Sequence, residues 1–121
     1  MRLLCADDEE DIRTILELAL SLDSEVQATI VRSGFELLDR AHDGPWDAFV
    51  LDGMMPGMDG YETCRRLKED PRTSATPVVF LSAKTQREDI DRAISLGAVA
   101  TLPKPFDPMT LAADLRSVLG M

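Results

Sequence analysis

The sequence predicts an α/β domain built on a parallel sheet, and three observations support this class. Short apolar runs alternate with segments in which apolar residues recur every three or four positions, which is typical of strands joined by crossover helices. Most helical segments begin with their own start signal. In addition, polar residues follow four of the apolar runs directly. Together these patterns predict five strand–helix units within the 121 residues.

The first unit and the following strand set the pattern. The apolar run Arg2–Ala6 predicts a strand, and Glu10–Leu22 carries apolar residues at helical spacing. A second strand is predicted over Glu25–Val31. Its polar Gln27 and Thr29 indicate a less buried strand near the edge of the sheet.

A capping box marks the second helix. Ser33 and Glu36 have the spacing at which each side chain bonds the other's backbone N–H, so a short helix is expected to about Ala41. The dipeptide Gly44-Pro45 then interrupts the chain. The apolar residues of Asp47–Leu51 predict the third strand.

The segment that follows the third strand is a loop. Pro56 and two glycines within Gly53–Met58 exclude a helix or a central strand. Asp59 and Glu62 then form a second capping box, which opens a helix that runs to about Glu69.

The fourth unit begins after a turn-rich stretch, residues 70–77. The β-branched and aromatic residues of Val78–Leu81 predict a strand. Thr85 and Glu88 have capping-box spacing at the start of a fourth helix, and Gly97 fits the position that ends it.

The fifth unit closes the chain. Val99–Leu102 predicts the last strand, and Asp107 followed by Pro108 predicts an N-cap with proline in the first helical position. This helix is expected to end near Leu119. Residues 1–121 are therefore expected to form one domain, with no output domain in the chain.

Composition restricts the function. The formal net charge is −9 and the pI is near 4.5, which disfavours direct binding to nucleic acid or to anionic membranes. No apolar run reaches the ~20 residues of a membrane span, and no signal peptide is recognisable. Cys5 and Cys64 are expected to be buried or half-buried thiols in a reducing compartment, so a cytoplasmic protein is predicted.

Polar side chains stand where four of the apolar runs end. Asp7 and Asp8 follow the first run, Asp52 the third, Ser82 the fourth and Lys104 the fifth. The carboxyl ends of parallel strands meet at one edge of the sheet, where open α/β sheets bind ligands. These five residues are therefore predicted to form one site.

The predicted cluster suits phosphoryl chemistry. Three neighbouring carboxylates need a proton or a cation, and oxygen ligands favour Mg²⁺. Asp52, expected to be exposed before an irregular loop, can attack phosphorus, while Lys104 and Ser82 would bind the phosphoryl oxygens. Each residue also has a plainer interpretation: Asp8 as a helix cap, Lys104 as a surface lysine and Ser82 as a turn residue.

These residues lie in four motifs, which are Cys5-Ala6-Asp7-Asp8-Glu9, Leu51-Asp52-Gly53-Met54-Met55-Pro56-Gly57-Met58-Asp59-Gly60, Phe80-Leu81-Ser82-Ala83 and Lys104-Pro105-Phe106. Together the motifs resemble those of the response-regulator receiver domains of the CheY-like superfamily, across essentially the whole chain. The resemblance implies a flavodoxin-like (βα)5 three-layer sandwich with strand order 2-1-3-4-5. It also implies that a sensor histidine kinase or phosphotransfer protein phosphorylates Asp52.

The same resemblance implies a role for each residue of the site. Asp8 and Asp52 would bind Mg²⁺, or alternatively Mn²⁺, together with the backbone carbonyl of Met54. Asp7 would act through water. The residues implied to contact the phosphoryl group are Ser82, Ala83 and Lys104, and the Lys104–Pro105 peptide would be cis.

One position departs from the family pattern. Receiver domains usually carry Tyr or Phe three residues before the lysine, as a ring that changes rotamer with phosphorylation, and here the residue is Thr101. The downstream partner is expected on the face of helix four, strand five and helix five, with the chain a monomer or a weak phosphorylation-dependent dimer.

Two further positions tune the lifetime of the phosphorylated state in this family, and here they are Met54 and Lys84. Met54 has no group that could orient an attacking water, so slow hydrolysis is predicted.

The predicted function is a phosphorylation switch that turns over no separate substrate, and two alternatives compete with it. A phosphohydrolase of the haloacid-dehalogenase type would need an acid two residues after the nucleophile, where Met54 stands. A phosphorylation-independent interaction module would keep the fold without the switch, and Thr101 favours this alternative.

Overall fold

The computed structural model describes residues 1–84 and 86–121. Strands and helices alternate along the chain. The strands are β1 (Arg2–Ala6), β2 (Gln27–Val31), β3 (Ala48–Asp52), β4 (Val78–Ser82) and β5 (Ala100–Pro103). The helices are α1 (Glu10–Ser21), α2 (Gly34–Arg40), the 3₁₀ turn η1 (Ala41–Asp43), α3 (Gly60–Glu69), α4 (Arg87–Ser95) and α5 (Leu111–Leu119).

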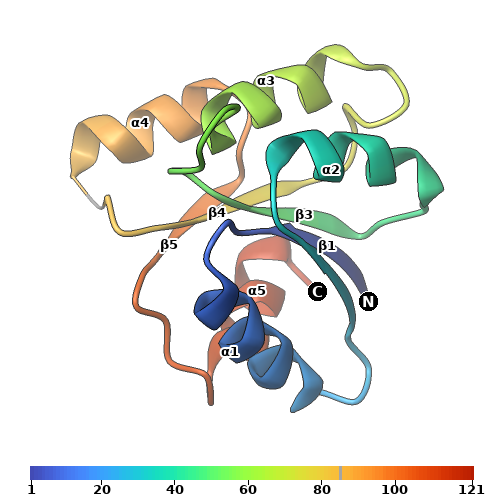
Figure 1. Cartoon of the computed structure of the whole chain (residues 1–121), viewed down its shortest axis with the longest axis vertical. Helices are drawn as coiled ribbons and strands as arrows, with labels where there is room; N and C mark the ends of the chain where they lie inside the picture. Colours follow the sequence, from blue (N-terminus) through green and yellow to red (C-terminus); the bar gives the residue numbers. More distant parts are fainter. Residues whose placement is uncertain (85) are drawn as a thin grey trace.

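The five strands form one parallel sheet in the order β2-β1-β3-β4-β5, which confirms the predicted three-layer α/β fold. Helices α1 and α5 cover one face, and α2, α3 and α4 cover the other (Figure 1). Because every crossover carries a helix, all strands point the same way, and their carboxyl ends meet at one edge.

The three central strands are buried on both faces. Along β3, the side chains of Phe49 and Leu51 enter the core beneath α2, α3 and α4, while Val50 packs on the side of α1 and α5. This alternation follows from the two-residue period of a strand. Gln27 of β2 is exposed, which confirms that β2 is an edge strand.

Two helix starts, those of α2 and α3, follow the predicted caps. The Ser33 hydroxyl accepts the Glu36 N–H at 3.0 Å, and the Asp59 carboxylate accepts the Glu62 N–H at 2.8 Å. Gly97 follows the last turn of α4 with φ of 105°, a left-handed conformation that favours glycine. The predicted capping box of Thr85 lies outside the described residues.

The predicted start of the last helix is wrong. The N–H groups of Thr110 and Leu111 both donate to the carbonyl of Asp107, so residues 108–110 form a separate turn. The Asp107 carboxylate does cap a backbone N–H, that of Met109 at 2.9 Å, but within this turn. Regular α5 then begins at Leu111, with Thr110 at the N-cap.

The observed boundaries of four strands differ from the predicted ones by one or two residues. β2 begins at Gln27 because the preceding residues form a turn, in which the Val26 N–H donates to the Asp23 carbonyl. β3, β4 and β5 each extend one residue further toward their carboxyl ends than predicted, so that Asp52 and Ser82 belong to the strands themselves.

The only tryptophan lies at the amino end of the sheet, just before β3. Trp46 is buried, its indole N–H donates to the Arg40 carbonyl at 3.2 Å, and the Arg2 guanidinium carbon lies 4.4 Å from the centroid of its ring. This end of the molecule is opposite the carboxyl ends of the strands.

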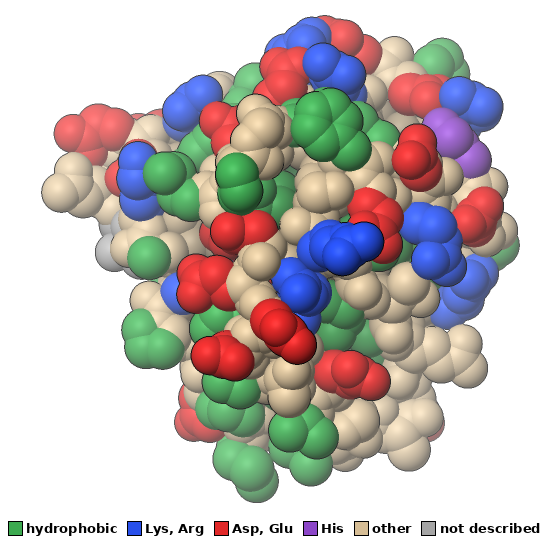
Figure 2. All heavy atoms as spheres, viewed as in Figure 1, with side chains coloured by type: hydrophobic (Ala, Val, Ile, Leu, Met, Phe, Trp, Pro, Cys, Tyr) green, Lys and Arg blue, Asp and Glu red, His purple; other side chains and the backbone are tan. Residues whose placement is uncertain are grey.

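Both cysteines are buried free thiols, as predicted. Burial raises the pKa of Cys5 to about 12 and that of Cys64 to about 11. Among the described residues, no helix combines the length and apolarity needed to cross a membrane. On the face shown in Figure 2, acidic and basic side chains are interspersed over the surface.

Candidate functional site

Four strand ends bring the predicted polar residues together. Asp7 follows β1 directly, Asp52 and Ser82 are the last residues of β3 and β4, and Lys104 follows β5. The register places these ends side by side, with Asp52 paired to Leu81 and Ser82 paired to Pro103. The sequence prediction that the five side chains share one edge is therefore confirmed for these four, and Asp8 joins them as described next.

Three carboxylates form the centre of the site. Oxygen atoms of Asp7, Asp8 and Asp52 all lie within 4.8 Å of one another. Asp7 and Asp52 are only 2% and 5% exposed, whereas Asp8 is more open to solvent. The expectation that the Asp52 carboxylate is exposed is thus wrong, because the neighbouring strand ends and the loop after β3 enclose it.

Lys104 is the cation of the cluster. Its ammonium nitrogen Nζ lies 2.5 Å from Asp7 Oδ2 and 3.3 Å from Asp52 Oδ2, and its side chain is 12% exposed. It is therefore not a solvated surface lysine. One lysine against three carboxylates leaves two uncompensated negative charges, which a divalent cation would neutralise. The oxygen donors and this charge fit Mg²⁺ or Mn²⁺.

For both Asp52 and Lys104, burial and the neighbouring opposite charge shift the pKa in opposite directions. Desolvation raises the pKa of Asp52, and the Met54 N–H and the Lys104 ammonium only partly offset it. Desolvation alone would lower the pKa of Lys104, but its hydrogen bond to Asp7 and the charge of Asp52 outweigh burial, so the net pKa is raised. A carboxylate of poor solvation beside a firmly protonated lysine is suited to nucleophilic attack on an anionic group.

Backbone groups fix the orientation of the two buried carboxylates. Asp7 Oδ1 accepts the Glu9 N–H at 3.0 Å, and Asp52 Oδ1 accepts the Met54 N–H at 3.1 Å. The Arg13 guanidinium of α1 donates to the Asp7 carbonyl at 2.9 Å, a contact that the sequence did not reveal. The second oxygens of both carboxylates thereby face Lys104.

Gly60 allows α3 to approach the nucleophile. A Cβ at this position would lie 2.2 Å from the Asp52 carbonyl oxygen, and the Gly60 N–H donates to the Gly53 carbonyl at 3.2 Å. The α3 start is therefore in close contact with the end of β3, and any side chain at Gly60 would push them apart.

Ser82 is buried next to this loop. Its hydroxyl accepts the Lys84 N–H at 3.0 Å, and its carbonyl accepts the Lys104 N–H at 2.9 Å. The Lys104–Pro105 peptide is cis, as the resemblance implied. Ser82 therefore links the loop that leads toward α4 with the loop after β5.

The remaining predicted residues lie around this centre. Met54 is 55% exposed, and the side chains of Ala83 and Lys84 are also exposed at the end of β4. Thr101 lies on β5, and its hydroxyl oxygen is buried without a hydrogen-bond partner among the described residues. No acidic group replaces Met54 two residues after Asp52, which counts against the phosphohydrolase alternative.

The comparisons with known proteins agree with this geometry. The sequence model of the response regulator receiver domain matches residues 3–116, and the chain belongs to this family of two-component systems. It is 39% identical over 97% of its length to the response regulator PleD of Caulobacter vibrioides, covering 26% of that protein. It is also 34% identical to the phosphate regulon transcriptional regulatory protein PhoB of Pseudomonas aeruginosa, with 97% of this chain and 51% of PhoB covered.

The chain thus spans between a quarter and about half of the length of these curated relatives. Among solved structures, it superposes on the chemotaxis protein CheY4 of Vibrio cholerae with a TM-score of 0.89 at 29% identity, covering 97% of both chains. It also superposes on the BeF3-activated DrrB receiver domain with a TM-score of 0.83 at 26% identity, covering 99% of this chain and 97% of the other.

Proposed function

We propose that Asp52 accepts a phosphoryl group from a sensor histidine kinase or a phosphotransfer protein in a step that depends on Mg²⁺. The observation that carries this proposal is the position of the Lys104 ammonium, 2.5 Å from Asp7 and 3.3 Å from Asp52 at the end of the central strand. A buried lysine between two carboxylates adds little to packing but is suited to bind an incoming phosphoryl group.

The acidic cluster would hold the cation. Asp8 and Asp52 are proposed as direct ligands together with the Met54 carbonyl, with Asp7 acting through water. Asp7 already accepts hydrogen bonds from Lys104 and the Glu9 N–H, which supports an indirect role. When bound, Mg²⁺, or Mn²⁺ in its place, supplies positive charge to the oxygens of the transferring phosphoryl group.

The chemical step is a displacement at phosphorus. A carboxylate oxygen of Asp52 attacks the phosphorus of the donor phosphohistidine, so that an O–P bond forms while the P–N bond breaks. The electron pair of the broken bond stays on the imidazole nitrogen, which is the leaving group. Lys104 is close enough to Asp52 to contact one phosphoryl oxygen, and we assign the Ser82 hydroxyl and the Ala83 N–H to the others.

Phosphorylation would act as a switch rather than as one half of a catalytic cycle. The new group adds about −1.5 to −2 charge at pH 7 inside a site that is largely closed to solvent. Once Ser82 turns its hydroxyl toward the phosphoryl group, the Lys84 N–H loses the acceptor it has at 3.0 Å. The face of α4, β5 and α5 is proposed to carry this change to a downstream protein in the cytoplasm.

Intact mass spectrometry tests the acceptor directly. The chain is incubated with Mg²⁺ and a small acyl phosphate, and wild type is expected to gain the mass of one phosphoryl group. Asp52→Asn and an EDTA-treated sample are expected to gain none. Asp91→Asn, which removes an exposed carboxylate from α4, is the matched control and should behave like wild type. No gain in wild type with any phosphoryl donor would refute the proposal.

The same material separates the two alternatives. A phosphorylation-independent interaction module predicts equal partner binding by wild type and Asp52→Asn. A phosphohydrolase predicts sustained release of phosphate from a small phosphoester in excess over the protein, whereas an acceptor domain stops after one equivalent unless its own phosphoryl group is hydrolysed.

A further inference from the structure

Receiver domains usually carry an aromatic ring at a position of β5 where this chain has Thr101. The threonine side chain is too small to act as such a ring. Thr101 pairs with Phe80 of β4, so both side chains lie on the face covered by α3 and α4. The Thr101 hydroxyl oxygen is buried and has no hydrogen-bond partner among the described residues. A change of rotamer at Thr101 would move one methyl and one hydroxyl, which gives α4 little to respond to.

A different aromatic ring occupies this region. Tyr61, the only tyrosine of the chain, enters from α3 and is 5% exposed. Its ring stacks on Phe80 with a centroid distance of 5.2 Å and an interplanar angle of 26°. The guanidinium carbon of Arg92 from α4 also lies over the Tyr61 ring, 4.0 Å from its centroid. Tyr61 therefore joins β4, α3 and α4 in one stack.

This stack reaches the phosphoacceptor site. Gly53 follows Asp52 directly, and a Cβ built on Gly53 would lie 3.7 Å from the Tyr61 hydroxyl and 3.4 Å from the Ser82 hydroxyl. The Tyr61 ring and the Ser82 hydroxyl thus border the same small space beside the nucleophile. The Tyr61 ring is the immediate neighbour of both Ser82 and the Gly53 backbone, so a displacement of either would reach the ring first.

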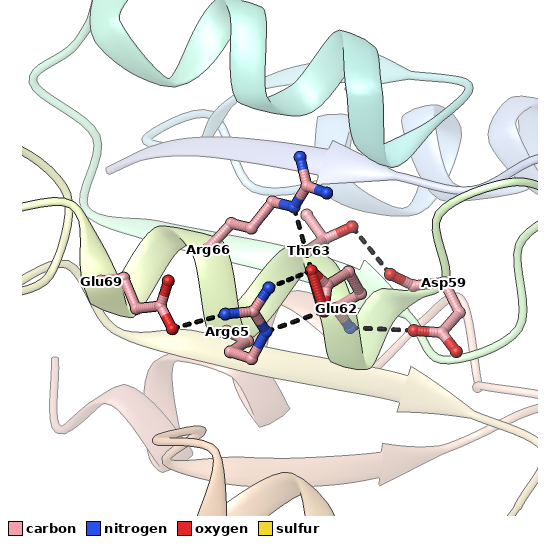
Figure 3. A network of polar contacts seen from close by, with 6 residues as sticks. All are labelled: Asp59, Glu62, Thr63, Arg65, Arg66 and Glu69. Carbon is pink, nitrogen blue, oxygen red and sulfur yellow. Dashed lines mark hydrogen bonds and ion pairs between the residues drawn. The ribbon is translucent and has the colours of Figure 1, made fainter.

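The polar contacts on the α3 side of the stack lie within the helix itself. On α3, the Asp59 carboxylate caps the first turn, and the Arg65 guanidinium bonds both Glu62 and Glu69 (Figure 3). Arg66 also donates to Glu62, at 3.0 Å. On α4, Arg92 itself is exposed.

A groove separates the two helices at this point. It has a volume of about 300 Å³ and is lined by Tyr61, Arg92 and Leu96 among other residues of α3 and α4. Because Gly60 holds the start of α3 against the end of β3, we expect a change at the site to displace α4 more than α3.

We infer that Tyr61 is a positioning residue that transmits the state of Asp52 to α4, in place of an aromatic ring on β5. This inference rests on the proposed function. When Ser82 turns to the phosphoryl group and releases the Lys84 N–H, the backbone at Lys84 changes, and the Arg92 contact with the Tyr61 ring changes with it. Stacking on Phe80 holds the Tyr61 ring in place next to the phosphoacceptor site.

Amide hydrogen exchange across α4 tests this inference. Wild type and variants are phosphorylated with Mg²⁺ and a small acyl phosphate, and intact mass gives the fraction phosphorylated in each sample. In wild type, exchange of residues 87–95 is expected to change severalfold on phosphorylation. Tyr61→Leu is expected to reach the same phosphorylated fraction as wild type. Its α4 exchange, however, should be nearly the same before and after phosphorylation. Tyr61→Phe, which keeps the ring, should retain the response.

A control variant and a second test variant separate transmission from loss of core packing. Phe49→Leu removes an aromatic ring from the same side of the sheet, at the far end of β3, and should preserve the α4 response if Tyr61 has a specific role. Arg92→Lys keeps the charge but loses the planar guanidinium, and should weaken the response. Because Tyr61 is the only tyrosine, 3-fluorotyrosine labelling gives a single fluorine resonance, which should shift in step with the mass gain.

The outcomes are distinct. A full α4 response in phosphorylated Tyr61→Leu would overturn the role of Tyr61 and leave the proposed function intact. An equal loss of response in Phe49→Leu would also overturn it, because general loosening of the core would then be the cause. Absence of any phosphoryl gain in wild type would refute the proposed function, and this inference with it.

Discussion

Replacing Lys104 with Met tests whether the cation of the site is also a stabilising element. The substitution keeps an unbranched side chain of similar length and removes the charge that lies 2.5 Å from Asp7 and 3.3 Å from Asp52. Both carboxylates are nearly inaccessible to solvent, so they would remain buried without a positive partner. Removing one member of a buried ion pair costs about 3–5 kcal/mol. We expect the lower end, about 3 kcal/mol, because the site opens toward solvent at Asp8.

Urea denaturation followed by circular dichroism measures this loss. With EDTA present and a slope of about 2 kcal/mol per molar urea, the midpoint of Lys104→Met should fall by about 1.5 M. Mg²⁺ at ten times its dissociation constant adds about 1.4 kcal/mol to a folded state that binds it, so adding Mg²⁺ should restore part of the loss. Lys84→Met, which changes an exposed lysine close to the same site, should stay within about 0.5 kcal/mol of wild type.

Two results would refute this reasoning. A loss below about 1 kcal/mol for Lys104→Met in EDTA would mean that water reaches the two carboxylates and solvates them. An equal loss in Lys84→Met would mean that the effect is one of net charge on the whole chain rather than of the buried contacts.

The remaining predictions concern lifetime, close approach and the thiols. Met54→Asn supplies a polar group two residues after the acceptor, so the phosphorylated protein should lose its phosphoryl group severalfold faster in a mass time course, and an unchanged rate would contradict the assigned role. Gly60→Ala places a Cβ 2.2 Å from the Asp52 carbonyl oxygen, so we expect a loss of about 1–3 kcal/mol and slower phosphorylation; wild-type values in both assays would contradict the close contact. Cys5 and Cys64, with pKa values raised to about 12 and about 11, should react slowly with thiol reagents at pH 8 until the chain unfolds. Because their folded-state pKa values are raised, the stability that these thiols contribute is present below pH ~9 and is lost as pH rises toward 11–12, which urea melts at pH 8 and pH 10.5 would detect.

Local chemistry explains why much of the fold was predictable. The caps at Ser33 and Asp59 depend on hydrogen bonds over three residues, so the sequence spacing was sufficient to identify them. The cluster at the carboxyl edge was predictable because parallel strands leave no other place for residues that follow their ends. Asp107 shows the limit of such signals, since its carboxylate caps the Met109 N–H of a turn instead of the first turn of α5.

The parts that the sequence did not reveal depend on contacts between distant segments. Asp52 is buried because the ends of β1 and β4, the Lys104 side chain and the start of α3 enclose it, and no feature within a few residues encodes this. The stack of Tyr61 between Phe80 and Arg92 joins three elements, although the single tyrosine beside Gly60 could have drawn attention to it. The Arg13 bond to the Asp7 carbonyl has no sequence signal that we can identify.

The positions of Trp46 and Tyr61 give this chain two separable spectroscopic reporters. The indole sits just before the amino end of β3, and the strand itself runs about 13 Å from Ala48 to Asp52, so events at the acidic cluster are too distant to quench it by contact. Tryptophan fluorescence should therefore follow unfolding and remain constant during titration with Mg²⁺ or phosphorylation. The fluorine signal of the labelled single tyrosine responds to the opposite end. One sample can thus report its folding and its signalling state at the same time, without an added dye.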